Sequence, residues 1–384
     1  MKTRNKYLHI DSFLRKNVIL VALIVCIVIF QILTKGILLS PRNLSNLLRQ
    51  TSIIGVVTMS MLMLIIAGNI DLACGMSAAA CGGIAAIVMV KWGLPAPIAV
   101  LLAIILGILI GVWQGMWIAK GGLVPFICTL GNQLLFKGLY LTTIQGKTIG
   151  PVSNSFKLIS QGYIPINVSW IICVIAVLVI IYSCVNKRKT AIKYGLDCGS
   201  IMSNIVQMLL YIGVIVALFW RLCSHQGLPV PVFIMLFIVV ITAIILQKTR
   251  FGRRIYAIGG NSEAAKLSGI NIERYTVALY VIAGLFAAIA GCMLVARLDG
   301  AVNSAGNAYE TDCISACVIG GASMSGGVGT VFGALLGALL ISVLENGMGL
   351  LNISTYFQYM VKGLILIIAV WFDITSRKAG RNKK

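Results

Sequence analysis

Long apolar segments alternate with short polar or basic segments along most of this 384-residue chain. The apolar runs are continuous, as in VILVALIVCIVIFQIL and SWIICVIAVLVIIY, without the strict alternation that is typical of half-buried strands. A helix rises about 1.5 Å per residue, so runs of this length can cross roughly 30 Å of hydrocarbon. Only helices and closed barrels satisfy their backbone groups in lipid, so the pattern predicts an all-α, polytopic membrane protein.

Division of the chain by this pattern predicts about 10–12 membrane-spanning helices. The least regular regions are 52–90, where AGNIDLACG interrupts the apolar run, and 312–324, which is short and either crosses fully or re-enters. The predicted spans lie near 18–34, 52–67, 72–90, 96–118, 124–143, 164–183, 205–220, 229–247, 276–296, 312–324, 328–345 and 356–372.

Composition and charge support this class and suggest an orientation. The chain is 59% hydrophobic and only 11% charged, whereas a soluble domain carries roughly a quarter charged residues. Most Lys and Arg residues fall on the side that holds both termini, so the positive-inside rule places that side in the cytoplasm. We therefore expect a cytoplasmic basic N-terminus (1–17), a transmembrane domain (18–372) that includes a cytoplasmic loop (248–275), and a cytoplasmic basic tail (373–384).

The net charge of +21 does not indicate a nucleic-acid partner. The basic residues lie between apolar runs, and they do not form a stripe with interleaved aromatic residues. Membrane lipid is the environment that the composition favours.

Few ionisable residues fall inside the predicted spans. Asp71, two residues after Asn69 in GNIDLACGMS, either caps the following span or marks a polar break near a transport path. Lys137 and Lys362 fall within predicted spans and could both snorkel, and Glu345, at the end of a span, is expected to reach interfacial water. The topology puts three acidic residues on the outer face: Asp299, Glu310 and Asp312. This scarcity of mid-membrane charge argues against an ion-coupled secondary transporter, which stays open as an alternative.

Glycines recur at a four-residue spacing in GGASMSGGVGTVFGALLGALL. Small residues at this spacing are typical of close helix packing in lipid, although glycine-rich segments can also bend to gate a pore. The predicted helix-packing glycines are Gly321, Gly329, Gly333 and Gly337.

The loop 248–275 contains a predicted short helix, in NSEAAKLSG. Asn261 or Ser262 would cap it, Glu263 would lie in its first turn, and Gly269 would end it. A rigid helix there suits docking to a soluble partner, and an ordinary structured loop is the alternative. The chain carries no hydrolase or metalloprotease motif and no metal-ligand cluster, so we do not predict an enzyme.

The same loop carries a family resemblance. FGRRIYAIGGNSEAAKLSGI resembles the signature of permease subunits of ribose/xylose-type bacterial ABC importers, and EAAKLSG fits their E-A-A-x-x-x-G pattern. GNIDLACG, VPFICTLGNQLLFKGLYL and YETDCISACVIGGASMSGGVGTVFGALLGALL resemble further family segments in collinear order, over roughly 45–370. Asn69 departs from the glycine usual before Ile-Asp. The stretches HQGLPVPVFIMLFIVV and GNAYETDCISACVIGG look most like xylose-type permeases.

The resemblance implies a multi-pass permease of the bacterial cytoplasmic membrane that imports a monosaccharide, xylose or a related sugar, as a homodimer. ATP and Mg²⁺ would bind to a cytoplasmic ATPase subunit, so this chain would hold no cofactor, and an extracytoplasmic binding protein would deliver the sugar. A permease of the same superfamily for another small solute, such as branched-chain amino acids, is the alternative. The resemblance carries over an ATPase-coupling segment made of Arg253, Gly259, Gly260, Asn261, Glu263, Ala264, Ala265 and Gly269.

Overall fold

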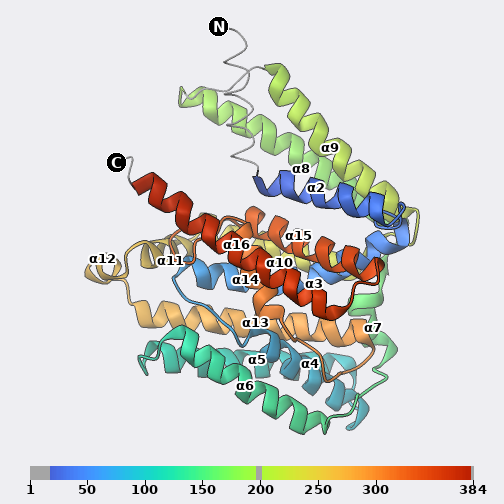
Figure 1. Ribbon diagram of the computed structural model, residues 1–384, viewed down its shortest axis with the longest axis vertical. Helices are drawn as coiled ribbons and strands as arrows, with labels where there is room; N and C mark the ends of the chain where they lie inside the picture. The colour runs from blue at the N-terminus through green and yellow to red at the C-terminus, as the bar shows by residue number, and fades with distance from the viewer. Residues whose placement is uncertain (1–17, 196–200, 382–384) are drawn as a thin grey trace.

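The computed structural model describes residues 18–195 and 201–381, which fold into a bundle of α-helices (Figure 1). Every predicted span coincides with a helix, and the predicted basic N-terminus (1–17) lies outside the described residues. The helices are α2 (Val18–Leu33), α3 (Pro41–Ile66), α4 (Cys74–Val90), α5 (Ala96–Ala119), α6 (Pro125–Ile144), α7 (Asn154–Gln161), α8 (Ile166–Lys193), α9 (Ile201–Cys223), α10 (Val230–Lys248), α11 (Arg250–Gly260), α12 (Ser262–Leu267), α13 (Ile272–Leu298), α14 (Tyr309–Ile319), α15 (Val331–Leu350) and α16 (Thr355–Arg381).

Strands are almost absent from the described residues. The two short strands, β1 (Tyr163–Ile164) and β2 (Leu228–Pro229), pair antiparallel between the start of α8 and the start of α10. Seven of the described helices are long and apolar enough to cross a membrane: α3, α5, α8, α9, α10, α13 and α15. Shorter apolar stretches lie in α2, α4 and α16. The prediction of an all-α, polytopic membrane protein is thus confirmed.

The centre of the bundle is formed by α3 and α13. Nearly every residue of α3 after Thr51 is buried, and α13 packs against α3, α4 and α5. In Figure 1 these helices lie in the middle of the bundle, while α8 and α9 lie at the edge farthest from α6. Many large apolar side chains of α8 and α9 are exposed, which suits a lipid-facing edge.

Glycines allow the central helices to approach closely. A methyl group at Gly107 of α5 would lie 2.3 Å from the carbonyl oxygen of Gly284 in α13, and one at Gly284 would lie 1.9 Å from the Gly107 oxygen. Between α4 and α13, a methyl group at Gly82 would lie 2.5 Å from the Gly291 oxygen, and one at Gly291 would lie 2.1 Å from the Ala78 oxygen. The backbone of α13 therefore touches the backbones of α5 and α4. Contacts of this type hold helices together where lipid provides no hydrophobic driving force.

Of the two alternatives left open for 312–324, a full crossing is excluded. The helix found there, α14, has 11 residues and is therefore only about 16 Å long, roughly half the thickness of the hydrocarbon. Residues 320–330 form turns and extended backbone, with Gly321, Gly326 and Gly327 at positive φ. Glycine is unfavourable within a helix and tolerates positive φ, which explains why the apolar run stops being helical.

Candidate functional site

Two short helices, α11 and α12, project from one end of the bundle, the end at which α16 also terminates (Figure 1). The side chain of Asn261 accepts a hydrogen bond from the backbone N–H of Ala264 at 3.0 Å and thereby caps α12. Gly269, at φ +79°, follows the end of α12. The predicted capped helix in 261–269 is therefore confirmed, although α11, capped by the hydroxyl of Thr249, was not predicted.

The predicted coupling segment presents one side to solvent. The exposed members are Arg253, Gly260, Asn261, Glu263, Ala264 and Gly269, while Gly259 is partly buried and Ala265 is buried. Sequence reasoning missed Leu267, whose side chain is 89% exposed at the end of α12. An apolar side chain held out on a capped, rigid helix is a feature expected of a docking surface. The only sequence signal for it is an apolar residue beside polar ones in a short helix.

The base of α11 contacts two other segments of the bundle. A methyl group at Gly259 would lie 1.8 Å from the carbonyl oxygen of Ile66, at the end of α3. That oxygen accepts a hydrogen bond from the N–H of Gly327 at 2.8 Å, and the hydroxyl of Tyr256 donates to the Gly329 oxygen at 2.7 Å. The α11–α12 unit is thus joined both to the end of α3 and to the turn between α14 and α15.

The chain after α3 is interrupted by a helix break at 67–73, which holds Asn69 and Asp71. Asp71 is buried, and its carboxylate accepts hydrogen bonds from the N–H of Ala73 at 2.9 Å and from Gln114 of α5 at 3.4 Å. The hydroxyl of Tyr280 in α13 donates to the Ile70 oxygen at 2.8 Å. Asp71 therefore lies next to the N-terminal end of α4, where a carboxylate is favoured. Its side chain is held by α5, and the backbone of the preceding residue is held by α13.

A second break, at 299–308, joins α13 to α14 and meets the first break. A methyl group at Gly75, in the first turn of α4, would lie 2.2 Å from the oxygen of Gly306, and the converse distance is 2.1 Å. Asp299 fixes the start of this segment through Lys157, whose ammonium lies 2.8 Å from the carboxylate, and the hydrogen bond from Lys157 lowers the pKa of Asp299. The start of α4, after the first break, therefore contacts the second break, between α13 and α14, through two glycines.

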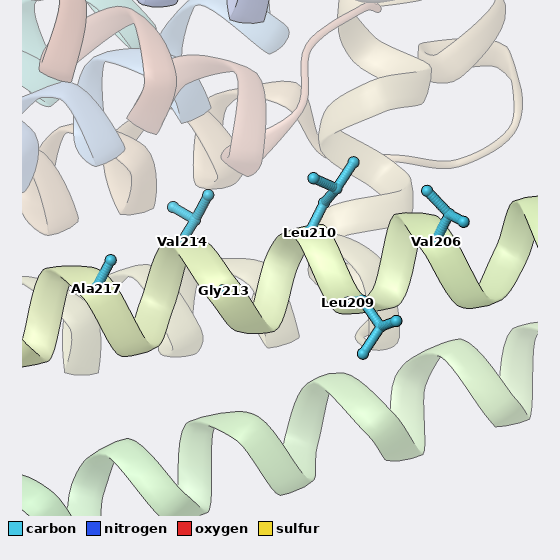
Figure 2. Close-up of a pocket in the computed structure, with 6 residues that line it drawn as sticks. All are labelled: Val206, Leu209, Leu210, Gly213, Val214 and Ala217. Atoms are coloured by element: carbon cyan, nitrogen blue, oxygen red, sulfur yellow. The ribbon is translucent and has the colours of Figure 1, made fainter.

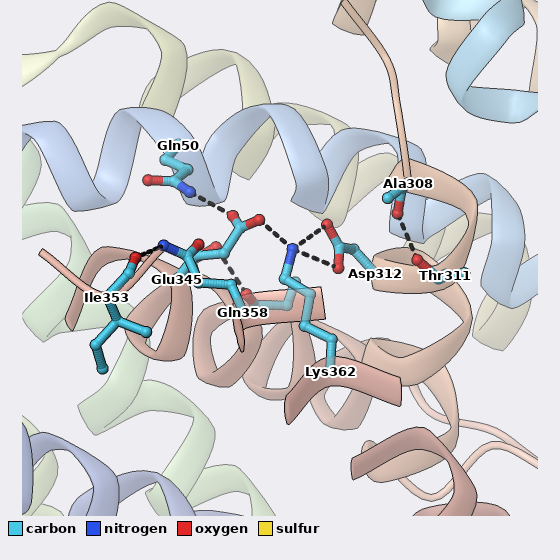
Figure 3. A network of polar contacts seen from close by, with 10 residues as sticks. Gln50, Ala308, Thr311, Asp312, Glu345, Ile353, Gln358 and Lys362 are labelled. Carbon is cyan, nitrogen blue, oxygen red and sulfur yellow. Dashed lines mark hydrogen bonds and ion pairs between the residues drawn. The ribbon is translucent and has the colours of Figure 1, made fainter. Parts of the chain in front are cut away.

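Buried charges connect α14, α15 and α16, contrary to expectation (Figure 3). Lys362 of α16 pairs with Asp312 of α14 at 3.0 Å and with Glu345 of α15, whose carboxylate also accepts from Gln50 of α3. Asp312 is only 2% exposed and Lys362 9%. The predictions of an outer-face Asp312 and a snorkelling Lys362 are therefore wrong, because long-range contacts draw both charges into the protein, whereas the Glu345 side chain stays 20% exposed.

Glu310 also differs from the outer-face prediction. Its side chain turns toward α6, where one carboxylate oxygen accepts from the amide of Gln133 at 2.8 Å, and the other oxygen is buried. Only Asp299 of the three predicted outer-face acids lies in a partly exposed position beside a surface lysine.

The four predicted helix-packing glycines lie in three different surroundings. A methyl group at Gly333 would lie 2.1 Å from the Gly320 oxygen, and one at Gly337 would lie 2.0 Å from the Ala316 oxygen, so both lie where α15 contacts α14. Gly329 contacts Ile66 and Leu62 from the turn before α15. A methyl group at Gly321 would meet nothing within 4 Å, and its φ of +85° allows the turn after α14.

Two surface hollows complete the description. A shallow apolar hollow of ≈ 450 Å³ lies along α9 around Gly213 (Figure 2), and its position on an apolar edge suits lipid. A polar pocket of ≈ 440 Å³ lies at the beginning of α3, at the opposite end of that helix from α11. It is lined by Ile37, Ser40, Arg42, Asn43, Asn46, Arg49, Tyr163 and His225. Among the described residues no group of three His, Cys, Asp or Glu side chains is placed to hold a metal ion.

A bundle with interrupted helices, buried charges and an exposed helical unit at one end defines a membrane transport protein. The family model described as "Branched-chain amino acid transport system / permease component" matches residues 43–370, and the chain belongs to this family. It is therefore a multi-pass membrane protein of the class of transport permease components.

Three similar proteins are named as sugar permeases. The Xylose transport system permease protein XylH of Haemophilus influenzae is 40% identical, over 95% of this chain and 97% of the relative. XylH of Escherichia coli K12 is 39% identical, over 94% and 92%. The Ribose import permease protein RbsC of Bacillus subtilis is 35% identical, over 97% of both. No solved structure matches the chain. The resemblance to ribose/xylose-type permeases is thus confirmed.

Proposed function

We propose that this chain is the transmembrane permease subunit of an ABC importer that moves a monosaccharide, xylose or a related sugar, across the bacterial cytoplasmic membrane. A separate cytoplasmic ATPase subunit binds ATP and Mg²⁺, and this chain binds no cofactor of its own. The identity of the relatives supports the cargo, because xylose permeases match at 39–40% and a ribose permease at 35% across nearly the whole chain. Branched-chain amino acids, which the family description names, are the alternative cargo.

The observation that carries the proposal is the position of the α11–α12 unit. Leu267 is exposed at the end of α12. At the end of α11, Gly259 lies against Ile66 and against Gly327 in the turn after α14. Ile66 directly precedes the break with Asp71, and Gly327 lies in the turn that follows α14. A displacement of α12 by an ATPase would therefore move both the end of α3 and the end of α14. The start of α4, which follows the first of these ends, is in contact with the segment that precedes α14 through Gly75 and Gly306. Motion there would alternate access to the two sides.

Charge supports the orientation that this mechanism needs. The positive-inside rule puts the basic α11–α12 segment and both termini in the cytoplasm. The binding protein then docks at the opposite end, near the pocket at the start of α3, and a second copy of this chain completes a homodimer.

One observation favours an ion-coupled secondary transporter as a second candidate. Asp312 and Lys362 are buried and pair with each other and with the partly buried Glu345, and ion-coupled transporters use charges within their helical bundles in this way. In this chain, however, the lysine is paired with both carboxylates, and the relatives are permease components of multi-protein transport systems.

Reconstitution separates the two candidates. The chain is placed in proteoliposomes with its ATPase subunit and binding protein, and uptake of a panel of labelled sugars is measured with and without ATP. We expect ATP-dependent uptake of D-xylose or a related pentose. Concentrative uptake by the chain alone, driven by an ion gradient, would refute the ABC assignment.

A further inference from the structure

Helix α6 has the length to cross a membrane but not the composition. It has 20 residues, as α15 does, yet only α15 is among the seven described helices that are apolar enough to cross. The residues that interrupt its apolar sequence are Asn132, Gln133 and Lys137. A polar side chain that faces hydrocarbon is costly, so part of α6 must face water or protein.

Among these residues, Lys137 is the one whose side chain would cost the most free energy in hydrocarbon, because it is charged. It is exposed, although about 10 Å of helix separates it from the end of α6 at Ile144. In the part of the chain that the structure describes, the salt bridges do not include Lys137, whose positive charge interacts electrostatically with Glu310. Gln133 precedes it by four residues and so lies on the same face of α6. The two side chains form one polar strip.

Glu310 of α14 extends this strip. Gln133 donates to one of its carboxylate oxygens at 2.8 Å. The other oxygen, Oε2, is buried and has no partner among the described residues. A methyl group at Gly75 would lie 3.1 Å from Oε2, so this oxygen lies beside the contact between the two helix breaks. A buried carboxylate oxygen without a partner requires a donor, and none is supplied by the described residues.

A monosaccharide has the complementary chemistry, because each hydroxyl group both donates and accepts. We propose that Glu310, Gln133 and Lys137 line the sugar path and bind the hydroxyl groups of the passing monosaccharide. Gln133 and Lys137 donate to sugar oxygens, and Glu310 accepts from a hydroxyl through Oε2 when the contact between Gly75 and Gly306 opens and exposes that oxygen. This inference rests on the proposed function and adds to it the side chains that contact the cargo.

Water access to the strip is the first test, and it does not depend on transport. Lys137→Cys and Leu135→Cys are made in the full-length chain in lipid nanodiscs, and a charged, water-soluble thiol reagent is added. Leu135 is also exposed but lies on roughly the opposite side of α6, so it is the matched control. Both changes are made in a Cys128→Ser background, because α6 has its own free cysteine there, and labelling is followed at the α6 peptide by mass spectrometry, since half-buried free cysteines such as Cys26 and Cys184 lie elsewhere in the chain.

We expect the α6 thiol of the Lys137→Cys variant to react at least about ten-fold faster than that of the Leu135→Cys variant, because a charged reagent does not enter hydrocarbon. Equal rates in the two variants would overturn the inference, since they would mean that Lys137 faces lipid and snorkels. Sugar uptake by the unmutated complex tests the proposed function separately, so the two ideas can fail independently.

The second test addresses the sugar contact. In the reconstituted transport complex, Glu310→Gln should raise the KM for D-xylose uptake by about ten-fold, because it removes a charged acceptor. Glu273→Gln, the same change at an exposed position in the first turn of α13, should leave that KM unchanged. An unaltered KM in Glu310→Gln, measured in a complex that still takes up sugar, would overturn the proposed contact.

Discussion

Gly259 of α11 lies against the carbonyl oxygen of Ile66 at the end of α3, and a methyl group at Gly259 would stand 1.8 Å from that oxygen. No side chain fits between the two backbones. The contact joins the exposed α11–α12 unit to the residue that precedes the first helix break, and so to the region of Asp71. The close approach of these two backbones gives the coupling proposal a position at which it can be tested.

Gly259→Ala should uncouple ATP hydrolysis from transport. The added methyl group must push α11 away from α3, at a cost of about 1–3 kcal/mol for an overpacked contact. We expect sugar-stimulated ATPase activity of the reconstituted complex to fall about ten-fold or more. Gly213→Ala in α9 is the control, because a methyl group there meets nothing within 4 Å and the position is outside the coupling segment. Equal activity in the two variants would refute the role of the Gly259–Ile66 contact.

Leu267→Asp should weaken binding of the ATPase subunit. The side chain is 89% exposed, so the free chain should fold normally, but a charge would replace an apolar contact in the complex. The measurement is copurification of the ATPase with tagged permease. Leu94→Asp changes an exposed leucine in the turn between α4 and α5 and should leave copurification unaffected. If the ATPase copurifies with the Leu267→Asp variant as well as it does with the unmutated chain, the docking surface lies elsewhere.

Lys362→Met should destabilise the bundle. It leaves Asp312 and Glu345 without their shared cation, and breaking a buried ion pair from one side costs about 3–5 kcal/mol. Thermal unfolding in detergent should begin at clearly lower temperature. Adding Asp312→Asn to Lys362→Met should recover part of the loss, because one uncompensated charge is removed. Identical unfolding of Lys362→Met and the unmutated protein would show that the cluster contributes nothing to stability.

Gly107→Ala should separate α5 from α13. Its methyl group would lie 2.3 Å from the Gly284 oxygen, so the contact between α5 and α13 must open. Gly213→Ala in α9 meets nothing within 4 Å, and replacing a helical glycine there should stabilise the protein slightly, by about 0.5–1 kcal/mol. Opposite shifts in unfolding temperature are therefore expected from the same chemical change. Shifts of the same sign and size would contradict the close approach of the two helices.

The amino-acid sequence by itself determined where the helices lie, because hydrophobic runs and capping residues act over a few neighbouring positions. Each predicted span became a helix, and Asn261 caps α12 as expected. The resemblance carried by EAAKLSG and the related segments also placed the chain in its family before any coordinate was known.

Only the tertiary structure decided which of the polar residues meet. Asp312 and Lys362 are 50 positions apart, and nothing local to either predicts their ion pair. The same holds for Gly259 and Ile66, for Glu310 and Gln133, and for Gly321, which shares the spacing of the packing glycines but occupies a turn. The physical reason is that a charge or a glycine takes its role from what lies across the interface, and the interface is made by helices that are distant in sequence.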